Sequence, residues 1–269
     1  MLRIPKKSVM SGRRVILKFG SGILTRTDRA EMDEEQLCKL VQAIAELKRR
    51  GHAVVVVSSG AVASGLKAMG FRERPQEITT LQACAAVGQT YLMHTYQSYL
   101  RGHGLYVAQL LLTHADLESK ERAEKVKNTL LRLLENPNVV PIINENDSVA
   151  VEELRFGDND KLSSRVAQLW GADLLILLTS VPGLMDLKSD GAVNIVPVVE
   201  DVNSVLHLAQ EDKGAFSVGG MASKLRAVAD AVAGNVECII ASGRHPEQIA
   251  DLVEGNGTGT RFPLPASKA

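Results

Sequence analysis

Short apolar runs of strand length alternate with amphipathic helical stretches along almost the whole chain. The runs occupy residues 15–19, 53–57, 105–112, 139–143, 174–178 and 236–240. Nearly continuous apolar runs are typical of strands in a parallel sheet, which is covered by helices on its faces. The alternation therefore predicts an α/β fold built from βα units around a mainly parallel central sheet.

The clearest predicted helix follows the first run. Asp33 can cap its start, Gln36 completes a capping box three residues later, and Gly51 marks its end. One apolar stripe runs along it, made of Leu37, Leu40, Val41, Ile44 and Leu47. Further helices are expected near residues 75–101, 118–134, 161–170 and 221–233. We expect the Gly-, Thr- and Pro-rich tail, residues 255–269, to be a loop or a last edge segment.

Composition argues against several classes of partner. The 31 basic and 31 acidic side chains cancel, whereas proteins that bind nucleic acid or anionic membranes usually carry a basic excess. No apolar run approaches the ~20 residues of a membrane span, and no apolar region follows the charged start as it would in a secretion signal. The three cysteines (Cys38, Cys84 and Cys238) are far apart and lie among apolar neighbours. We expect them to be buried, inert thiols in a cytoplasmic protein.

Polar residues gather where the predicted strands end, which is where ligands bind in doubly wound sheets. The first strand runs through Lys18 into Gly20-Ser21-Gly22, and the second ends in small residues from Ser58 to Gly65. Residues 218–224 place two glycines at a helix start, with Lys224 in its first turns. Backbone N–H groups at such places bind anions, although each segment alone is also compatible with an ordinary turn.

An acidic and amide-rich region follows the fourth strand. It comprises Asn144-Glu145-Asn146-Asp147-Ser148 and, a few residues later, Gly157-Asp158-Asn159-Asp160-Lys161. The spacing of an EF-hand is missing, so organisation of a ligand or of Mg²⁺ is favoured over a capped surface loop. Two glycine-rich anion sites, two lysines and this region together indicate phosphoryl transfer.

Motifs of other enzyme classes are absent from the sequence. No glycine is followed by lysine, so there is no Walker A motif, and Thr25 stands where a dinucleotide-binding loop needs its third glycine. The six histidines form no HExxH pair, and no G-x-S-x-G elbow occurs. Metal-dependent and serine-dependent hydrolysis are therefore disfavoured.

Six segments of the chain resemble the amino acid kinase family. They are residues 15–21, 57–61, 85–89, 144–147, 157–160 and 219–224, in the family's order. The 144–147 and 157–160 pair is similar to the members that phosphorylate glutamate. The resemblance implies a three-layer αβα sandwich, with glutamate over the N-terminal half and ATP over the C-terminal half of a single domain spanning residues 1–269. It also implies transfer of the γ-phosphoryl group to the glutamate side-chain carboxylate, the first step of proline biosynthesis.

The resemblance also assigns roles to residues. Lys18, Lys224 and Asp160 would be catalytic, with Asp160 holding both lysines, and Asp158 would help bind Mg²⁺. The nucleotide would contact Lys18, Gly20, Ser21, Thr179, Ser180, Val218, Gly219, Gly220, Met221, Ala222, Ser223 and Lys224. Glutamate would contact Ser59, Gly60, Ala61, Asn144, Asp147 and Asn159.

Some positions depart from the family pattern. Ser180 replaces an aspartate, Met185 an aromatic residue and Val218 a threonine, and Gly22 lies where a hydroxyl or alanine is typical. We expect no C-terminal PUA-type domain. The resemblance further implies a homo-oligomer, dimer or tetramer, with inhibition by proline and a downstream glutamyl phosphate reductase as partner. The alternatives are a related kinase acting on acetylglutamate, aspartate, carbamate or UMP, and a non-catalytic amino acid or nucleotide sensor.

Overall fold

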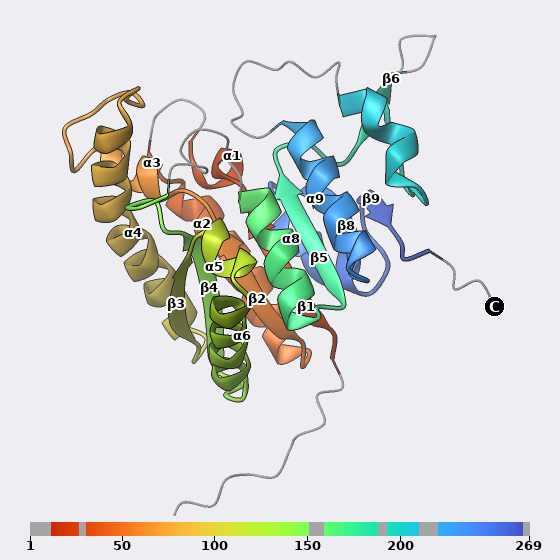
Figure 1. Ribbon diagram of the computed structural model, residues 1–269, viewed down its shortest axis with the longest axis horizontal. Coiled ribbons are helices and arrows are strands. Elements are labelled where there is room, and N and C mark those ends of the chain that lie inside the picture. The colour runs from red at the N-terminus through yellow and green to blue at the C-terminus, as the bar shows by residue number, and fades with distance from the viewer. Residues whose placement is uncertain (1–11, 27–30, 151–158, 188–192, 210–219, 266–269) are drawn as a thin grey trace, which may run out of the picture.

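The structure is a computed structural model, which describes residues 12–26, 31–150, 159–187, 193–209 and 220–265. Within these described ranges, seven strands form one sheet in the order β3-β4-β2-β1-β5-β8-β9 (Figure 1). The strands are β1 (Arg14–Phe19), β2 (Ala53–Ser58), β3 (Tyr106–Leu112), β4 (Val139–Glu145), β5 (Leu174–Thr179), β8 (Glu237–Ser242) and β9 (Gly259–Phe262). All neighbours pair in parallel except β8 and β9. The predicted mainly parallel sheet is therefore confirmed, with the tail supplying an antiparallel edge strand.

Helices cover both faces of the sheet, as the three-layer sandwich requires. One face carries α1 (Ser21–Leu24), α2 (Glu34–Arg49), α4 (Ile78–Arg101) and α10 (Ile249–Val253). The other carries α6 (Lys120–Leu134), α8 (Asn159–Trp170), α9 (Met221–Ala233) and the 3₁₀ helix η1 (Val202–Ala209). The sequence did not predict α1, η1, α10, the short helices α3 (Ala61–Leu66), α5 (His114–Glu118) and η2 (Pro246–Gln248), or the hairpin of β6 (Met185–Leu187) and β7 (Val193–Ile195). The five predicted helices are present.

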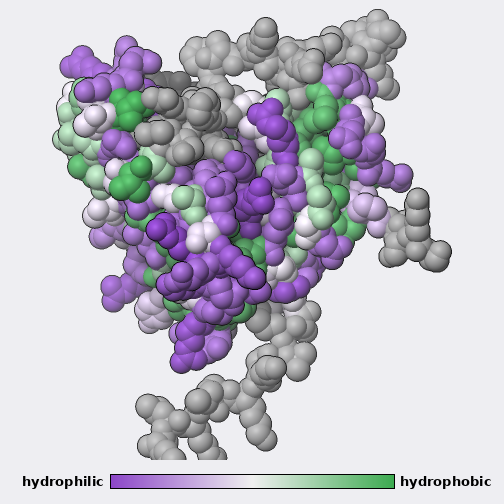
Figure 2. All heavy atoms as spheres, viewed as in Figure 1, coloured by the Kyte–Doolittle hydropathy of each residue, from purple (hydrophilic) through white to green (hydrophobic). Residues whose placement is uncertain are grey.

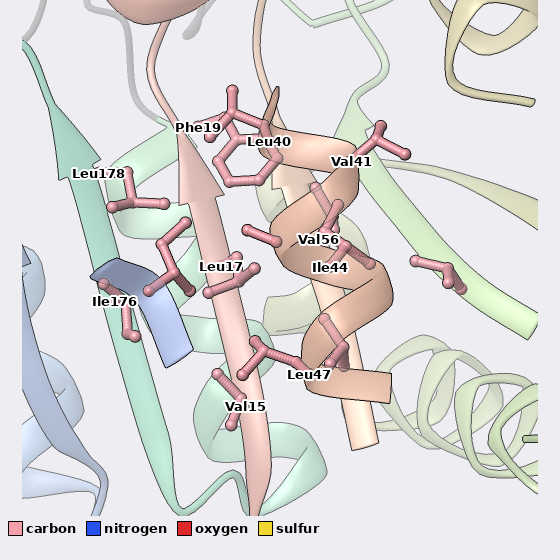
Figure 3. Packing of buried hydrophobic residues seen from close by; sticks show 14 of the residues in the cluster. Val15, Leu17, Phe19, Leu40, Val41, Ile44, Leu47, Val56, Ile176 and Leu178 are labelled. Carbon is pink, nitrogen blue, oxygen red and sulfur yellow. The ribbon is translucent and has the colours of Figure 1, made fainter. Parts of the chain in front are cut away.

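The period of two along each strand separates the two cores. Val15, Leu17 and Phe19 of β1 pack beneath α2, while Ile16 faces the opposite layer. Figure 3 shows the apolar stripe of α2 lying against β1, β2 and β5. The outer side of α6 is hydrophilic (Figure 2). Among the described residues, no helix has the length and apolar character that crossing a membrane requires.

Two local expectations need correction. Asp33 caps α2 by accepting a hydrogen bond from the Gln36 backbone at 3.1 Å, but the Gln36 side chain does not complete a capping box. It donates instead to the carbonyl of Gly243 at 2.5 Å, because the loop after β8 lies against α2. Cys84 and Cys238 are buried free thiols, whereas Cys38 is only half-buried and the prediction for it was wrong.

Candidate active site

Lys18, Asp160 and Lys224 form a buried charged cluster at the carboxyl ends of the central strands. Lys18 lies near the end of β1, Asp160 in the first turn of α8, and Lys224 in the first turn of α9. The Lys18 Nζ lies 2.6 Å from Asp160 Oδ1, and the Lys224 Nζ lies 3.1 Å from Asp160 Oδ2. The alternation of β1 turns Lys18 toward α8, on the same face as Ile16, so this lysine does not point to solvent.

The charge state of Asp160 follows from its two partners. Burial alone would raise the pKa of this carboxyl group, but the charges and hydrogen bonds of Lys18 and Lys224 together hold its pKa below the ordinary value. One carboxylate between two ammonium groups leaves the cluster with one formal positive charge. An anion that approaches these lysines is therefore attracted, and Asp160 fixes both ammonium groups before it arrives.

Backbone groups of two helix starts lie beside the lysines. A Cβ built on Gly20 would lie 3.5 Å from the Lys18 Nζ, which places the Gly20 backbone next to that ammonium group. Gly220 precedes α9 in an extended conformation, and Ser223 Oγ is within hydrogen-bond distance of Gly220 O and of Asp160 Oδ2, at 2.9 and 3.2 Å. The N–H groups of the first turn of α9 have no partner within the helix, and together with the two lysines they suit a polyphosphate.

A second polar cluster adjoins the first, and it is called the lysine-free cluster because the described side chains that form it include no lysine. Asn159 Nδ2 donates to Ser59 Oγ and to Asn144 Oδ1, each at 2.9 Å, and all three side chains are buried. Asp147 is buried as well, two residues beyond the end of β4. Gly60 precedes α3 with a φ of 103°, a left-handed conformation that favours glycine, and so turns the chain into the start of that helix at Ala61. The predicted substrate residues thus lie at neighbouring strand ends.

Several residues predicted to contact the nucleotide are exposed, are half-buried or lie outside the described residues. Thr179 is half-buried at the end of β5 and Ser180 is exposed, and Met221 packs its side chain into the core beneath α9. Ser21 is exposed in the first turn of α1, and Ala222 is half-buried. Asp158, Val218 and Gly219 lie outside the described residues. The nucleotide contacts assigned to these residues stay predictions.

The structure adds polar residues that the motifs did not single out. Ser58 Oγ lies 3.0 Å from the hydroxyl of the fully buried Tyr96, and burial raises the pKa of that phenol although the Ser58 hydrogen bond opposes the shift. Gln89 of α4 accepts from Asn144 Nδ2 at 2.9 Å. Gln89 ends one of the six resembling segments, so the sequence held a signal for it, whereas nothing marked Tyr96.

The carboxylates near the lysines bear on the predicted Mg²⁺ site. In the part of the chain that the structure describes, no three His, Cys, Asp or Glu side chains gather as metal ligands. Both oxygens of Asp160 are held by lysines. Asp158 lies outside the described residues, so its role in holding Mg²⁺ stays a prediction.

Comparison with known proteins decides the family. The model of the amino acid kinase family matches residues 13–242. The chain belongs to the amino acid kinase family. A glutamate 5-kinase from Aquifex aeolicus is 46% identical over 252 residues, which cover 93% of this chain and 68% of that protein. One from Clostridium acetobutylicum is 40% identical over 268 residues, 98% of each chain. The resemblance predicted from the six segments is confirmed.

Solved structures confirm the fold. Carbamate kinase from Giardia lamblia bound to AMP-PNP has a TM-score of 0.65 at 18% identity, covering 96% of this chain and all of that one. An isopentenyl phosphate kinase substrate complex has a TM-score of 0.64 at 16% identity, covering 93% of this chain and 99% of that one. The three-layer sandwich is thus shared with both of these proteins, and identities this low carry no argument about the substrate.

Proposed function

We propose that the chain transfers the γ-phosphoryl group of ATP to the side-chain carboxylate of L-glutamate, giving glutamyl 5-phosphate and ADP. The observation that carries this proposal is the adjacency of Asn159 and Asp160 at the start of α8. Asn159 bonds to the lysine-free polar cluster, and Asp160 bonds to both lysines. An amino acid bound at the first cluster would place its side chain beside the phosphoryl site at the second.

The proposed mechanism requires charge neutralisation and alignment rather than proton abstraction. A carboxylate is already ionised at neutral pH, so its oxygen can attack phosphorus without a general base. The bond from that oxygen to phosphorus forms while the bond to the ADP oxygen breaks, and Lys18 and Lys224 stabilise the charge on the transferring group. The Gly20 and Ser21 backbone would donate to the same oxygens. Bound Mg²⁺ would neutralise further phosphate charge, with Asp158 assigned to help hold it.

The lysine-free cluster is assigned to glutamate. Asp147 would pair with the α-ammonium group, while Ser59 and the backbone at Gly60 and Ala61 would donate to a carboxylate, with Asn144 and Asn159 completing the pocket. The halves of the chain divide accordingly, glutamate over the N-terminal half and ATP over the C-terminal half. Relatives named glutamate 5-kinase support this choice over acetylglutamate, aspartate, carbamate or UMP as acceptor.

The test is an assay with ATP, Mg²⁺ and hydroxylamine, which traps an acyl phosphate as a hydroxamate. Hydroxamate formed with L-glutamate and not with aspartate or acetylglutamate is the expected result. Activity only with another acid would support phosphoryl transfer and contradict the assignment of the pocket to glutamate. No activity with any acid, together with measurable glutamate binding, would favour a non-catalytic sensor.

Three broader features follow from the resemblance to the relatives and are part of the proposal. They are a homo-oligomer, inhibition by proline, and transfer of the labile acyl phosphate to a reductase in proline biosynthesis. Light scattering of the purified protein and the hydroxamate assay with added proline test the first two. A cytoplasmic location is proposed on the free thiols of Cys38, Cys84 and Cys238.

A further inference from the structure

A chain of side-chain amides leads from the lysine-free cluster to the surface of the molecule. Asn159 Nδ2 donates to Asn144 Oδ1 at 2.9 Å, Asn144 Nδ2 donates to Gln89 Oε1 at 2.9 Å, and Gln89 Nε2 donates to Gln109 Oε1 at 2.9 Å. These residues belong to α8, β4, α4 and β3. Gln89 is 9% exposed and Gln109 is exposed, so this series of hydrogen-bonded amides ends at solvent.

One backbone group sets the direction of this chain. The N–H of Glu145 donates to Asn144 Oδ1 at 2.9 Å, and a backbone donor cannot exchange its role with an acceptor. The oxygen of Asn144 must therefore face Glu145 and Asn159, so its NH₂ group faces α4. Gln89 then has to present its oxygen to Asn144 and its NH₂ group to Gln109. The orientation of each amide is therefore fixed by the orientation of the preceding amide, starting from Asn144.

We propose that Gln89 is a positioning residue for glutamate binding, acting through Asn144 and Asn159. Gln89 supplies the acceptor that Asn144, 1% exposed, needs for its NH₂ group. Without the Gln89 oxygen, the NH₂ group of Asn144 would be a buried donor with no acceptor. Rotation of the Asn144 side chain would then lower the free energy. Rotation would remove one acceptor that aligns Asn159, whose Nδ2 also donates to Ser59 Oγ and to Ser58 O. This inference rests on the proposed function, because it takes the Ser59, Asn144 and Asn159 cluster as the glutamate pocket.

The packing of α4 supports a fixed position for Gln89. The preceding residue, Gly88, lies so close to α3 that an added Cβ would be 1.9 Å from the Ala61 carbonyl. This close approach fixes the helix at the turn that carries Gln89. The amide therefore has a rigid base, which a positioning residue requires.

The test compares Gln89→Leu with a matched control on the same helix. Gln97 also carries a structural amide, accepting from the Val107 N–H at 2.9 Å, but it bonds to the edge strand β3 and not to the cluster. In the hydroxamate assay, we expect Gln89→Leu to raise the KM for glutamate about tenfold or more, with the KM for ATP unchanged. We expect Gln97→Leu to lower the melting temperature and leave both KM values within about twofold of the unmodified protein.

Two further results separate positioning from folding. Gln89→Glu retains an oxygen acceptor for Asn144 Nδ2 and should recover most of the glutamate affinity lost in Gln89→Leu, and it replaces Gln89→Leu as the decisive variant if the latter does not fold. A glutamate KM in Gln89→Leu within twofold of the unmodified protein, or a Gln89→Glu variant as weak as Gln89→Leu, would overturn the inference and leave the proposed function intact. An unmodified protein that forms no hydroxamate with glutamate would overturn both.

Discussion

Lys224 bonds to Asp160 in the cluster and is 8% exposed. An ammonium group that binds the phosphates and strengthens its contact as charge develops should affect turnover more than the binding of glutamate. We predict that Lys224→Ala lowers kcat about 100-fold or more while the Kd for glutamate changes little. Steady-state kinetics and calorimetric titration with glutamate check this. The control is Arg226→Ala, an exposed cation of the same helix, and loss of glutamate affinity with intact turnover would contradict the role.

Asp160 links catalysis to stability, because its carboxylate compensates two buried ammonium groups. Removing one partner from such a cluster leaves charge buried without compensation, so Asp160→Asn should lower the free energy of unfolding by about 3 kcal/mol near neutral pH. The pKa of Asp160 is lower when folded than when unfolded. Its stabilisation is therefore fully present above the unfolded pKa of about 3.9 and is lost as the pH falls through the lower, folded pKa.

Urea denaturation of both proteins at several pH values measures this dependence. The difference between them should be constant from about pH 7 to about pH 5 and should shrink only below about pH 4. Asp173→Asn is the control, because its ion pair with Arg14 lies at the surface and should contribute less than about 1 kcal/mol. A difference that already declines near neutral pH would show that the Asp160 pKa is not lowered.

At the scale of elements, α3 and α4 cross at two glycines. A Cβ on Gly88 would lie 1.9 Å from Ala61 O and 2.5 Å from Gly65 N, both backbone atoms of α3. Gly88→Ala must therefore displace α3, whose start carries the proposed glutamate donors. We predict a higher glutamate KM and a melting temperature lower by several degrees, measured by kinetics and calorimetry. Gly102→Ala is the control at the end of the same helix, where the added Cβ would lie 3.4 Å from Tyr99 O. It should change the glutamate KM and the melting temperature only slightly.

The same elements show how far the sequence could predict the structure. Each long helix and parallel strand has its own periodicity or apolar run, which is local information, so these elements were predicted. The helix α3 has 6 residues, too few to show a periodic stripe, and it packs on α4 because Gly65 and Gly88 allow a close approach. Gln36 fits a local capping pattern in the sequence, yet its side chain donates a hydrogen bond to Gly243, which is distant in the sequence.

The candidate site divides in the same way. Lys18, Asp160 and Lys224 each stood in a recognisable motif, and the sequence could group them by resemblance. The sequence could not predict the hydrogen bonds of Tyr96 and Gln89, because they join α4 to β2 and β4 across large sequence separations. Hydrogen bonds of this kind arise from the packing of layers, which no local pattern specifies.

For the whole molecule, the two proposed substrate sites meet at the start of α8 and otherwise use different strands and helices. Ligands that bind only the folded chain stabilise it by mass action, about 2.7 kcal/mol at a hundred times the Kd. We predict that glutamate and a non-hydrolysable ATP analogue with Mg²⁺ each raise the melting temperature by roughly 5–10 °C. Lys224→Ala should reduce the shift with nucleotide and keep the shift with glutamate, while Gln89→Leu should do the reverse. Calorimetry of the two variants measures all four shifts, and equal losses in both variants would mean that the clusters do not bind separate ligands.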